Sequence, residues 1–359
     1  MKKIVLTGGG TAGHVTPNIA MIPRLRELGY EIYYIGSYNG IEKRLVADCG
    51  IPYTGISTGK FRRYFDPKNF SDPIRVIRGI REAAAALKKI RPDVVFSKGG
   101  FVSVPVVQAA RSLRIPVVCH ESDMTPGLAN RLCIPASVKV CCNFPETVSR
   151  LPERKAVLTG TPIRQELLSG SRDAAIRFTG LGGERPVILV IGGSLGAQAV
   201  NEAIRAALPQ LLKTYDVIHL CGKGKTDESL EGTKGYVQYE YISAELPDLF
   251  ALADIAVSRA GANAICELLA LRKPNLLIPL PAKASRGDQI LNARSFEKQG
   301  FSMVMEEEEL TTLRLIEAVD RLYESRDSFR SAMEESAHTD SISVITELLE
   351  EVRLKNGED

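Results

Sequence analysis

Short apolar runs alternate with longer segments of helical periodicity along most of the chain. The first runs, Lys3–Thr7 and Glu31–Ile35, flank a helical segment that ends before Gly29. Further strands are expected at residues 93–97, 116–120, 138–143 and 156–159. Val- and Ile-rich runs separated by helices are typical of parallel sheets covered on both faces. The pattern therefore predicts consecutive βαβ units.

The same plan starts again in the second half. Pro186–Ile191 is expected to be a buried strand, Gly192–Ala197 a glycine-rich turn and Gln198–Leu212 a helix. Strands are then expected at residues 216–220, 236–238, 254–258 and 275–279. A strand, glycine turn and helix at the beginning of each half predict an α/β protein with two Rossmann-like domains, residues 1–163 and 164–340. The linker is expected near Gly160–Glu166.

Composition excludes several classes of function. With 359 residues, 25% charged residues and a net charge of +3, the chain lacks the basic character of a nucleic-acid-binding protein. Seven cysteines without a Cys-x-x-Cys pair favour buried thiols in a reducing cytoplasm over disulfides or zinc. Only three apolar residues precede the first glycines, too few for a signal peptide, so membrane contact is expected to be peripheral.

The first glycine turn has the spacing of a phosphate-binding loop. Gly8, Gly10 and Gly13 follow a predicted strand and precede a helix, whose N-terminus can bind phosphate. A dinucleotide site also needs an acidic residue at the end of the second strand, and Glu42 lies well past it. A bound NAD is therefore disfavoured, as is a redox or non-catalytic nucleotide-binding protein.

Two other nucleotide motifs fail. A P-loop at Gly224–Thr226 would need glycine where the chain has His219. No Asp-x-Asp pair occurs, so no metal site and no cofactor are expected. A helix N-terminus and a cationic side chain would then balance the negative charge of a bound diphosphate.

Seven segments together resemble one family over nearly the whole chain. They are Gly8–His14, Pro92–Phe101, His120–Ser122, Gly160–Arg164, Gly192–Ala197, Arg259–Glu267 and Asp288–Gln289. In this order they resemble the MurG family, the UDP-N-acetylglucosamine transferases that convert lipid I to lipid II. Asp123 and Asp288 depart from the asparagine and glutamine of some members.

The resemblance implies the GT-B fold, in which two Rossmann-like domains face each other across a cleft. Residues 164–340 would hold the UDP-sugar, residues 1–163 would face the lipid acceptor, and a helix within 341–359 would pack back on the first domain. The implied reaction is an inverting transfer to the 4-hydroxyl of the muramoyl sugar. Another lipid glycosyltransferase of this fold, such as a diacylglycerol glucosyltransferase, is the alternative.

The resemblance also implies donor contacts. Glu267 would bind the ribose, although a solvated acid near a helix start is the plainer interpretation. Gln289 would bind sugar hydroxyls or be an ordinary helix residue. The other implied donor contacts are Ser194 and Arg164 at the diphosphate, the Ile242 backbone at uracil, and Thr11, Ala12, Gly13 and Asp123.

Two residues compete as the general base. His14 ends the first glycine loop, and imidazole titrates near neutrality, so it suits removal of a hydroxyl proton. Alternatively, His14 only caps the helix and positions the acceptor. Glu121 follows a buried strand, where parallel sheets place binding loops, and is the second candidate.

A basic and aromatic segment is expected to contact the membrane. Lys60, Arg62, Arg63 and Lys68 are interleaved with aromatic residues and would bind the anionic inner leaflet. An apolar line follows at helical spacing, formed by Ile74, Ile77, Ile80, Ala84 and Leu87, and its part from Ile77 to Leu87 is expected to cover the sheet. The predicted location is therefore the cytoplasmic face of the cell membrane.

Overall fold

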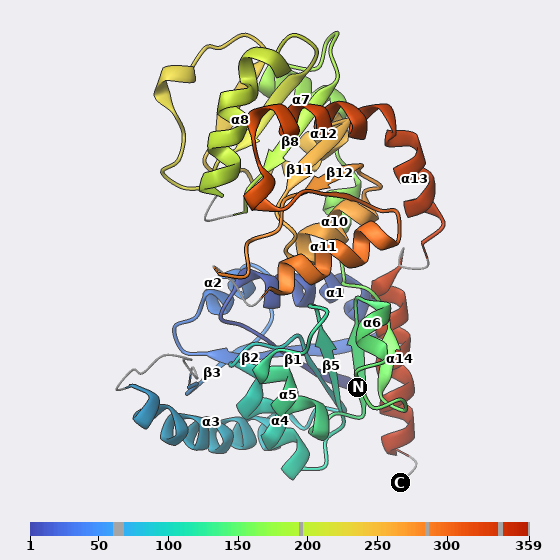
Figure 1. The fold of residues 1–359 in the computed structure, drawn as a ribbon. Coiled ribbons are helices and arrows are strands. Elements are labelled where there is room, and N and C mark those ends of the chain that lie inside the picture. Colours follow the sequence, from blue (N-terminus) through green and yellow to red (C-terminus); the bar gives the residue numbers. More distant parts are fainter. Residues whose placement is uncertain (60–67, 194–196, 284–286, 337–339, 358–359) are drawn as a thin grey trace. The chain divides into compact units, whose positions relative to one another are not determined.

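A computed structural model gives the fold (Figure 1). It describes residues 1–59, 68–193, 197–283, 287–336 and 340–357, the side chains of 68–73 and 356–357 excepted. The chain forms two compact units, Met1–Arg164 with Asp340–Asp359, and Gln165–Thr339. The second unit is thus an insertion between two parts of the first.

The first unit contains a fully parallel seven-stranded sheet. Its order is β3-β2-β1-β4-β5-β6-β7, so the direction of strand addition reverses between β1 and β4. The strands are β1 (Lys2–Thr7), β2 (Tyr30–Ser37), β3 (Tyr53–Ile56), β4 (Val94–Ser97), β5 (Val117–Glu121), β6 (Lys139–Cys142) and β7 (Ala156–Leu158). Such a reversal leaves a crevice at the carboxyl ends of the two strands, where ligands of doubly wound sheets bind.

Helices cover both faces of this sheet. Successive residues of β1 alternate between the two apolar layers: Val5 packs with α3 (Lys68–Ile90), α4 (Ser103–Ser112) and α5 (Leu128–Cys133). Ile4 and Leu6 pack on the opposite face with α1 (Thr16–Glu27), α2 (Ile41–Ala47) and α14 (Ser341–Gly357). The short α6 (Pro145–Val148) precedes β7. Because alternate residues of a strand are buried in opposite layers, each strand is apolar along its whole length.

The C-terminal helix α14 belongs to the first unit and lies beside α1 (Figure 1). Ile345 and Leu349 are fully buried in the layer that also contains Leu25. The Glu350 carboxylate receives a hydrogen bond from the Tyr30 hydroxyl and an ion pair from Lys2 Nζ at 2.6 Å. Apolar burial and this polar cluster together join the last helix to the start of the chain.

The N-terminal part of α3 differs from the prediction. Ile77 was expected to cover the sheet, but its exposed fraction is 55%, and that of Ile74, at the start of the same apolar line, is 70%. The buried face instead begins at Gly79, where an added Cβ would lie 2.0 Å from the Ser57 carbonyl oxygen. Because only glycine permits this approach, the helix contacts the sheet from Gly79 onward and presents the two isoleucines to solvent.

The second unit repeats the plan with a parallel six-stranded sheet. Its order is β10-β9-β8-β11-β12-β13, with the reversal between β8 and β11. The strands are β8 (Val187–Ile191), β9 (Asp216–Leu220), β10 (Tyr236–Tyr239), β11 (Ile255–Ser258), β12 (Asn275–Leu277) and β13 (Met303–Val304). The prediction of two Rossmann-like parallel sheets is therefore confirmed.

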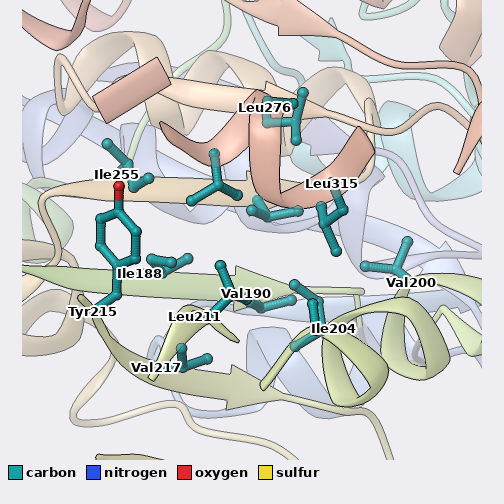
Figure 2. Packing of buried hydrophobic residues seen from close by; sticks show 14 of the residues in the cluster. Ile188, Val190, Val200, Ile204, Leu211, Tyr215, Val217, Ile255, Leu276 and Leu315 are labelled. Carbon is teal, nitrogen blue, oxygen red and sulfur yellow. The ribbon is translucent and has the colours of Figure 1, made fainter. Parts of the chain in front are cut away.

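Figure 2 shows the core on one face of this second sheet. Ile188 and Val190 of β8 meet Ile204 of α8 (Gln198–Leu211) and Leu315 of α12 (Thr312–Glu324). The remaining helices of the unit are α7 (Arg172–Thr179), α9 (Leu246–Leu252), α10 (Ala262–Ala270), α11 (Asp288–Lys298) and α13 (Arg326–Glu334). The packed core fixes the start of α8 close to the carboxyl end of β8.

Candidate functional site

The glycine loop after β1 is held by a buried carboxylate of its own unit. Glu42 is fully buried and accepts hydrogen bonds from the backbone N–H of Gly10 at 3.2 Å and of Ser37 at 3.0 Å. The Tyr34 hydroxyl donates to the Gly8 carbonyl at 2.7 Å. The sequence interpretation placed Glu42 well past β2, but the turn into α2 brings it back. A dinucleotide phosphate approaching Gly10 would meet this negative charge.

His14 closes the short 3-10 turn Ala12–His14 beside the glycine loop. Its ring is half-buried, and Nδ1 lies 3.0 Å from the Thr11 hydroxyl oxygen. Across the reversal point, an added Cβ at Gly100 would lie 3.2 Å from this nitrogen and 2.3 Å from the Gly9 carbonyl oxygen. The loops after β1 and β4 are therefore in close contact, with His14 at their junction.

Glu121, the second candidate base, organises the loop that follows β5. One carboxylate oxygen accepts from the Asp123 N–H at 3.0 Å, and the other accepts from Gly127 N–H at 3.0 Å and from Asn130 Nδ2 at 2.8 Å. Burial raises the pKa of the Glu121 carboxyl, while these donors act in the opposite direction. The Glu121 carboxylate therefore positions the loop that contains Asp123.

The sequence interpretation missed a buried lysine at the same sheet edge. Lys98 follows β4 directly, and its ammonium donates to His120 Nδ1 at 2.9 Å, to the Ser122 hydroxyl and to the Thr161 hydroxyl at 3.4 Å. The Gly160 carbonyl can only accept, so His120 Nε2 carries the ring proton. Burial, and then the nearby Lys98 charge, lower the pKa of His120 well below its usual value.

In the second unit, a cavity of about 760 Å³ lies at the reversal point of the sheet. Ile191 and Ser258, the last residues of β8 and β11, line it, together with Gly193 of the second glycine turn. The first residues of α8, α10 and α11 border the same space through Gln198, Gly261 and Gln289. Helix N-termini present unpaired backbone N–H groups and partial positive charge, which suits a phosphate group.

Two polar side chains of this cavity have defined orientations. The Gln289 amide oxygen accepts from the Leu280 N–H at 3.0 Å, so the amide nitrogen is the group left to donate to a ligand. Arg259 donates to the carbonyls of Ile278 at 3.1 Å and Pro279 at 3.2 Å and pairs with Glu307. Arg259 therefore holds the loop after β12, and its charge is balanced within the protein.

The remaining predicted donor residues lie in different places. Glu267 is in the second turn of α10, half-buried, and Ile242 is half-buried in the loop after β10; neither lines the cavity. Arg164 ends the first unit, and its buried Nε makes no hydrogen bond within the described structure. Thr11, Ala12 and Gly13 belong to the turn at His14. Ser194 lies outside the described residues.

The predicted membrane segment is described only in part. Lys60, Arg62 and Arg63 lie outside the described residues, and for Lys68 only the helical backbone is described. The described start of α3 exposes Ile74 and Ile77 next to the exposed basic residue Arg78, a combination suited to an anionic lipid surface. No helix in the described part of the chain is long and apolar enough to cross a membrane.

Histidine, cysteine and acidic side chains are protein groups that commonly hold metal ions. The described residues contain no group of three or more such side chains in a metal-binding arrangement.

Comparisons with known proteins agree with this architecture. Residues 4–140 match the model of the glycosyltransferase family 28 N-terminal domain, and residues 187–348 match that of the C-terminal domain. The solved structure of MurG from Acinetobacter baumannii aligns with a TM-score of 0.78 at 25% identity, over 98% of this chain and all of that one. The calicheamicin glycosyltransferase CalG4 aligns with a TM-score of 0.70 at 15% identity, which shows the fold alone.

Full-length relatives are more similar still. A UDP-N-acetylglucosamine--N-acetylmuramyl-(pentapeptide) pyrophosphoryl-undecaprenol N-acetylglucosamine transferase of Lachnoclostridium phytofermentans is 64% identical over 99% of this chain and 100% of its own length. A protein of the same name from Clostridium botulinum is 55% identical over 97% of this chain and 99% of its own. The GT-B fold class expected from the sequence is confirmed by these matches.

Proposed function

Because the chain belongs to the MurG family of UDP-N-acetylglucosamine transferases, we propose that it carries out the reaction for which its relatives are named. N-acetylglucosamine moves from UDP-N-acetylglucosamine to the 4-hydroxyl of the muramoyl sugar of undecaprenyl-pyrophosphoryl-MurNAc-pentapeptide, or lipid I. The product is lipid II, a precursor of peptidoglycan.

The cavity at the reversal point of the second sheet carries this proposal. Its volume of about 760 Å³ suits a nucleotide sugar, since ligand pockets commonly measure ~300–1,000 Å³. The N-terminus of α8 and the Gly193 backbone border it and supply N–H groups for a diphosphate. Gln289 supplies an amide donor for sugar hydroxyls. We assign the donor to residues 164–340 on this basis.

Glu267, Ile242, Ser194 and Arg164 are assigned to the same donor. A carboxylate on α10 accepts hydrogen bonds from both ribose hydroxyls, and the Ile242 backbone contacts uracil. Ser194 belongs to the glycine turn that would surround the diphosphate, and Arg164 would contribute a positive charge to its binding. Thr11, Ala12, Gly13 and Asp123 would contribute from the loops of the first unit.

We assign the acceptor and the proton transfer to residues 1–163. His14 is the better base because the Thr11 hydroxyl can hold one ring nitrogen and leave the other as the basic atom. Glu121 is less suited because three hydrogen bonds already occupy its oxygens. The deprotonated 4-hydroxyl attacks the anomeric carbon, the carbon–oxygen bond to UDP breaks, and backbone N–H groups bind the departing diphosphate.

We further propose that the enzyme binds peripherally to the anionic inner leaflet of the cell membrane. The exposed isoleucines Ile74 and Ile77 would enter the interface while Lys60, Arg62, Arg63 and Lys68 bind lipid phosphates. Co-sedimentation with anionic vesicles should fall when these four cations are neutralised, and binding to neutral vesicles should stay weak. Equal binding to both kinds of vesicle would contradict the electrostatic part of the proposal.

The decisive experiment is a radiolabelled transfer assay with UDP-N-acetylglucosamine and a short-chain analogue of lipid I. The expected product is the β-linked disaccharide lipid, formed at a similar rate in excess EDTA because no Asp-x-Asp clamp is present. UDP-glucose with diacylglycerol serves as the competing substrate pair. Transfer to diacylglycerol in place of the lipid I analogue would overturn the proposal.

A further inference from the structure

Lys225 lies on the loop after β9, and its side chain lines the cavity of the second unit. The side chain is half-buried, whereas Lys223 on the same loop is exposed. Among the described residues, the Lys225 ammonium makes no hydrogen bond and no ion pair. A partly buried cation that faces a cavity without a protein partner is arranged to meet an anion from solution.

The main chain that carries Lys225 is fixed on several sides. The Arg205 guanidinium donates to the Lys225 carbonyl, and the Lys225 N–H donates to the Gly222 carbonyl at 3.1 Å. The Gly224 N–H donates to Glu240 at 2.8 Å, and the Asp227 N–H donates to Gln238 at 2.9 Å. The loop is thus joined to both α8 and β10, so the lysine side chain starts from a constrained Cα position.

The other charged side chains of the cavity are engaged with protein groups. Arg259 pairs with Glu307 and donates to backbone carbonyls, so its charge serves the loop after β12. Glu202 accepts a hydrogen bond from Gln198 at 2.5 Å. Of the two cationic residues that line the described cavity, Lys225 is therefore the one positioned to bind an anionic ligand.

We propose that Lys225 binds the diphosphate of the nucleotide sugar and stabilises its charge as the glycosidic bond breaks. The inference rests on the proposed function and adds a residue that the sequence analysis met only within the rejected P-loop at Gly224–Thr226. A helix N-terminus supplies only about half a positive charge, and a diphosphate leaving group carries more than that. A lysine at the same cavity adds a full charge through a charge-assisted hydrogen bond.

The test compares uridine, UMP and UDP binding by calorimetry in the full-length protein and in Lys225→Met, Lys225→Arg and Lys223→Met. Lys225→Met is expected to weaken UDP binding about tenfold to hundredfold and to leave uridine binding unchanged. Lys225→Arg, which keeps the charge, should restore most of the UDP affinity. Lys223→Met is the matched control on the same loop and should bind UDP as the wild type does.

The outcomes separate this inference from the proposed function. If the wild type binds no UDP, the proposed function fails. If the wild type binds UDP and Lys225→Met binds it equally well, the function stands and the Lys225 inference is overturned. A proportional loss of uridine and UDP binding in a variant with wild-type circular dichroism would also overturn it, because the lysine would then act on the nucleoside or the loop.

Discussion

The Glu42 carboxylate accepts a hydrogen bond from the Gly10 N–H at 3.2 Å, although the two residues are 32 positions apart. An added Cβ at Gly9 would lie 2.6 Å from the carboxylate carbon of Glu42, and one at Gly40 would lie 2.4 Å from it. The glycine loop after β1 is therefore shaped around an internal carboxylate. Gly9 permits this close packing, and the loop differs in that respect from a dinucleotide-binding turn.

Replacing Glu42 with alanine should loosen the first glycine loop. The variant leaves the N–H groups of Gly10 and Ser37 without their acceptor, and a hydrogen bond to a charged group contributes ~1.5–3 kcal/mol. We expect a lower urea midpoint and slower transfer, with a smaller effect on UDP affinity because the cavity assigned to the diphosphate is in the other unit. Wild-type transfer by Glu42→Ala would show that the loop geometry does not matter for turnover.

Replacing Glu267 with alanine should mainly weaken donor binding. Loss of hydrogen bonding to the ribose is expected to raise the donor KM by about tenfold to hundredfold or more, since a single charge-assisted bond contributes ~1.5–3 kcal/mol. The measurement is steady-state kinetics with UDP-N-acetylglucosamine as the varied substrate. An unchanged donor KM would remove Glu267 from the ribose site, and Glu317→Ala, which removes an exposed carboxylate of α12 outside the cavity, is the control.

The pH–rate profile should identify the base. His14→Ala is expected to lose about 10²–10⁴-fold in turnover, to keep UDP affinity and to lose the acidic limb of the profile. Glu121→Gln should retain that limb but lose stability, because the amide oxygen replaces only one carboxylate oxygen and the NH₂ group then faces either the Asp123 N–H or the Gly127 and Asn130 donors without accepting. If the limb persists in His14→Ala and vanishes in Glu121→Gln, the roles are reversed.

Buried histidines should make the fold sensitive to acid. His219 is fully buried and accepts from the Tyr236 hydroxyl at Nδ1 while Nε2–H donates to Asn201, and burial lowers the pKa of His219 to about 3. A group whose folded pKa is depressed contributes stability that is present above its unfolded pKa of ~6.5. That contribution is lost as the pH falls from 6.5 towards 3, by ~1.4 kcal/mol per pH unit.

Urea unfolding at pH 7.5 and 5.5 measures this effect. The chain has no tryptophan, so circular dichroism is the suitable signal. His219→Gln is expected to be less stable than the wild type at pH 7.5 but to lose ~1.4 kcal/mol less between the two pH values. An equal loss in both proteins would contradict a proton-linked role for His219.

The sequence predicted the repeated strand, glycine turn and helix because parallel strands buried on both faces leave continuous apolar runs. It missed β3 and β13, which are short strands that each lie at one edge of their own sheet. It also misassigned Ile77, because helical periodicity alone does not tell which end of a long helix leaves the sheet. The position at which α3 makes contact is set by Gly79 and Ser57, a tertiary relationship.

The candidate site, like the fold, was predicted only in part from the sequence. Motif segments located the second glycine turn and Gln289, which the structure brings to one cavity. Lys98 lies within the motif segment Pro92–Phe101 and Lys225 within the rejected P-loop at Gly224–Thr226, but neither was singled out. Each follows a strand, and only the arrangement of the strands brings Lys98 to its partners and Lys225 to the cavity. Glu42 was set aside for its distance along the chain, although the turn into α2 returns it to the loop.

The insertion of residues 165–339 between two parts of the first unit sets an order on biosynthesis. As the chain leaves the ribosome, every residue of the second unit emerges before α14 does. The apolar layer that contains Leu25 therefore stays incomplete until Ile345 and Leu349 have been synthesised. A chain that ends directly after residue 339 would contain the complete second Rossmann unit attached to a first unit that lacks one of its covering helices.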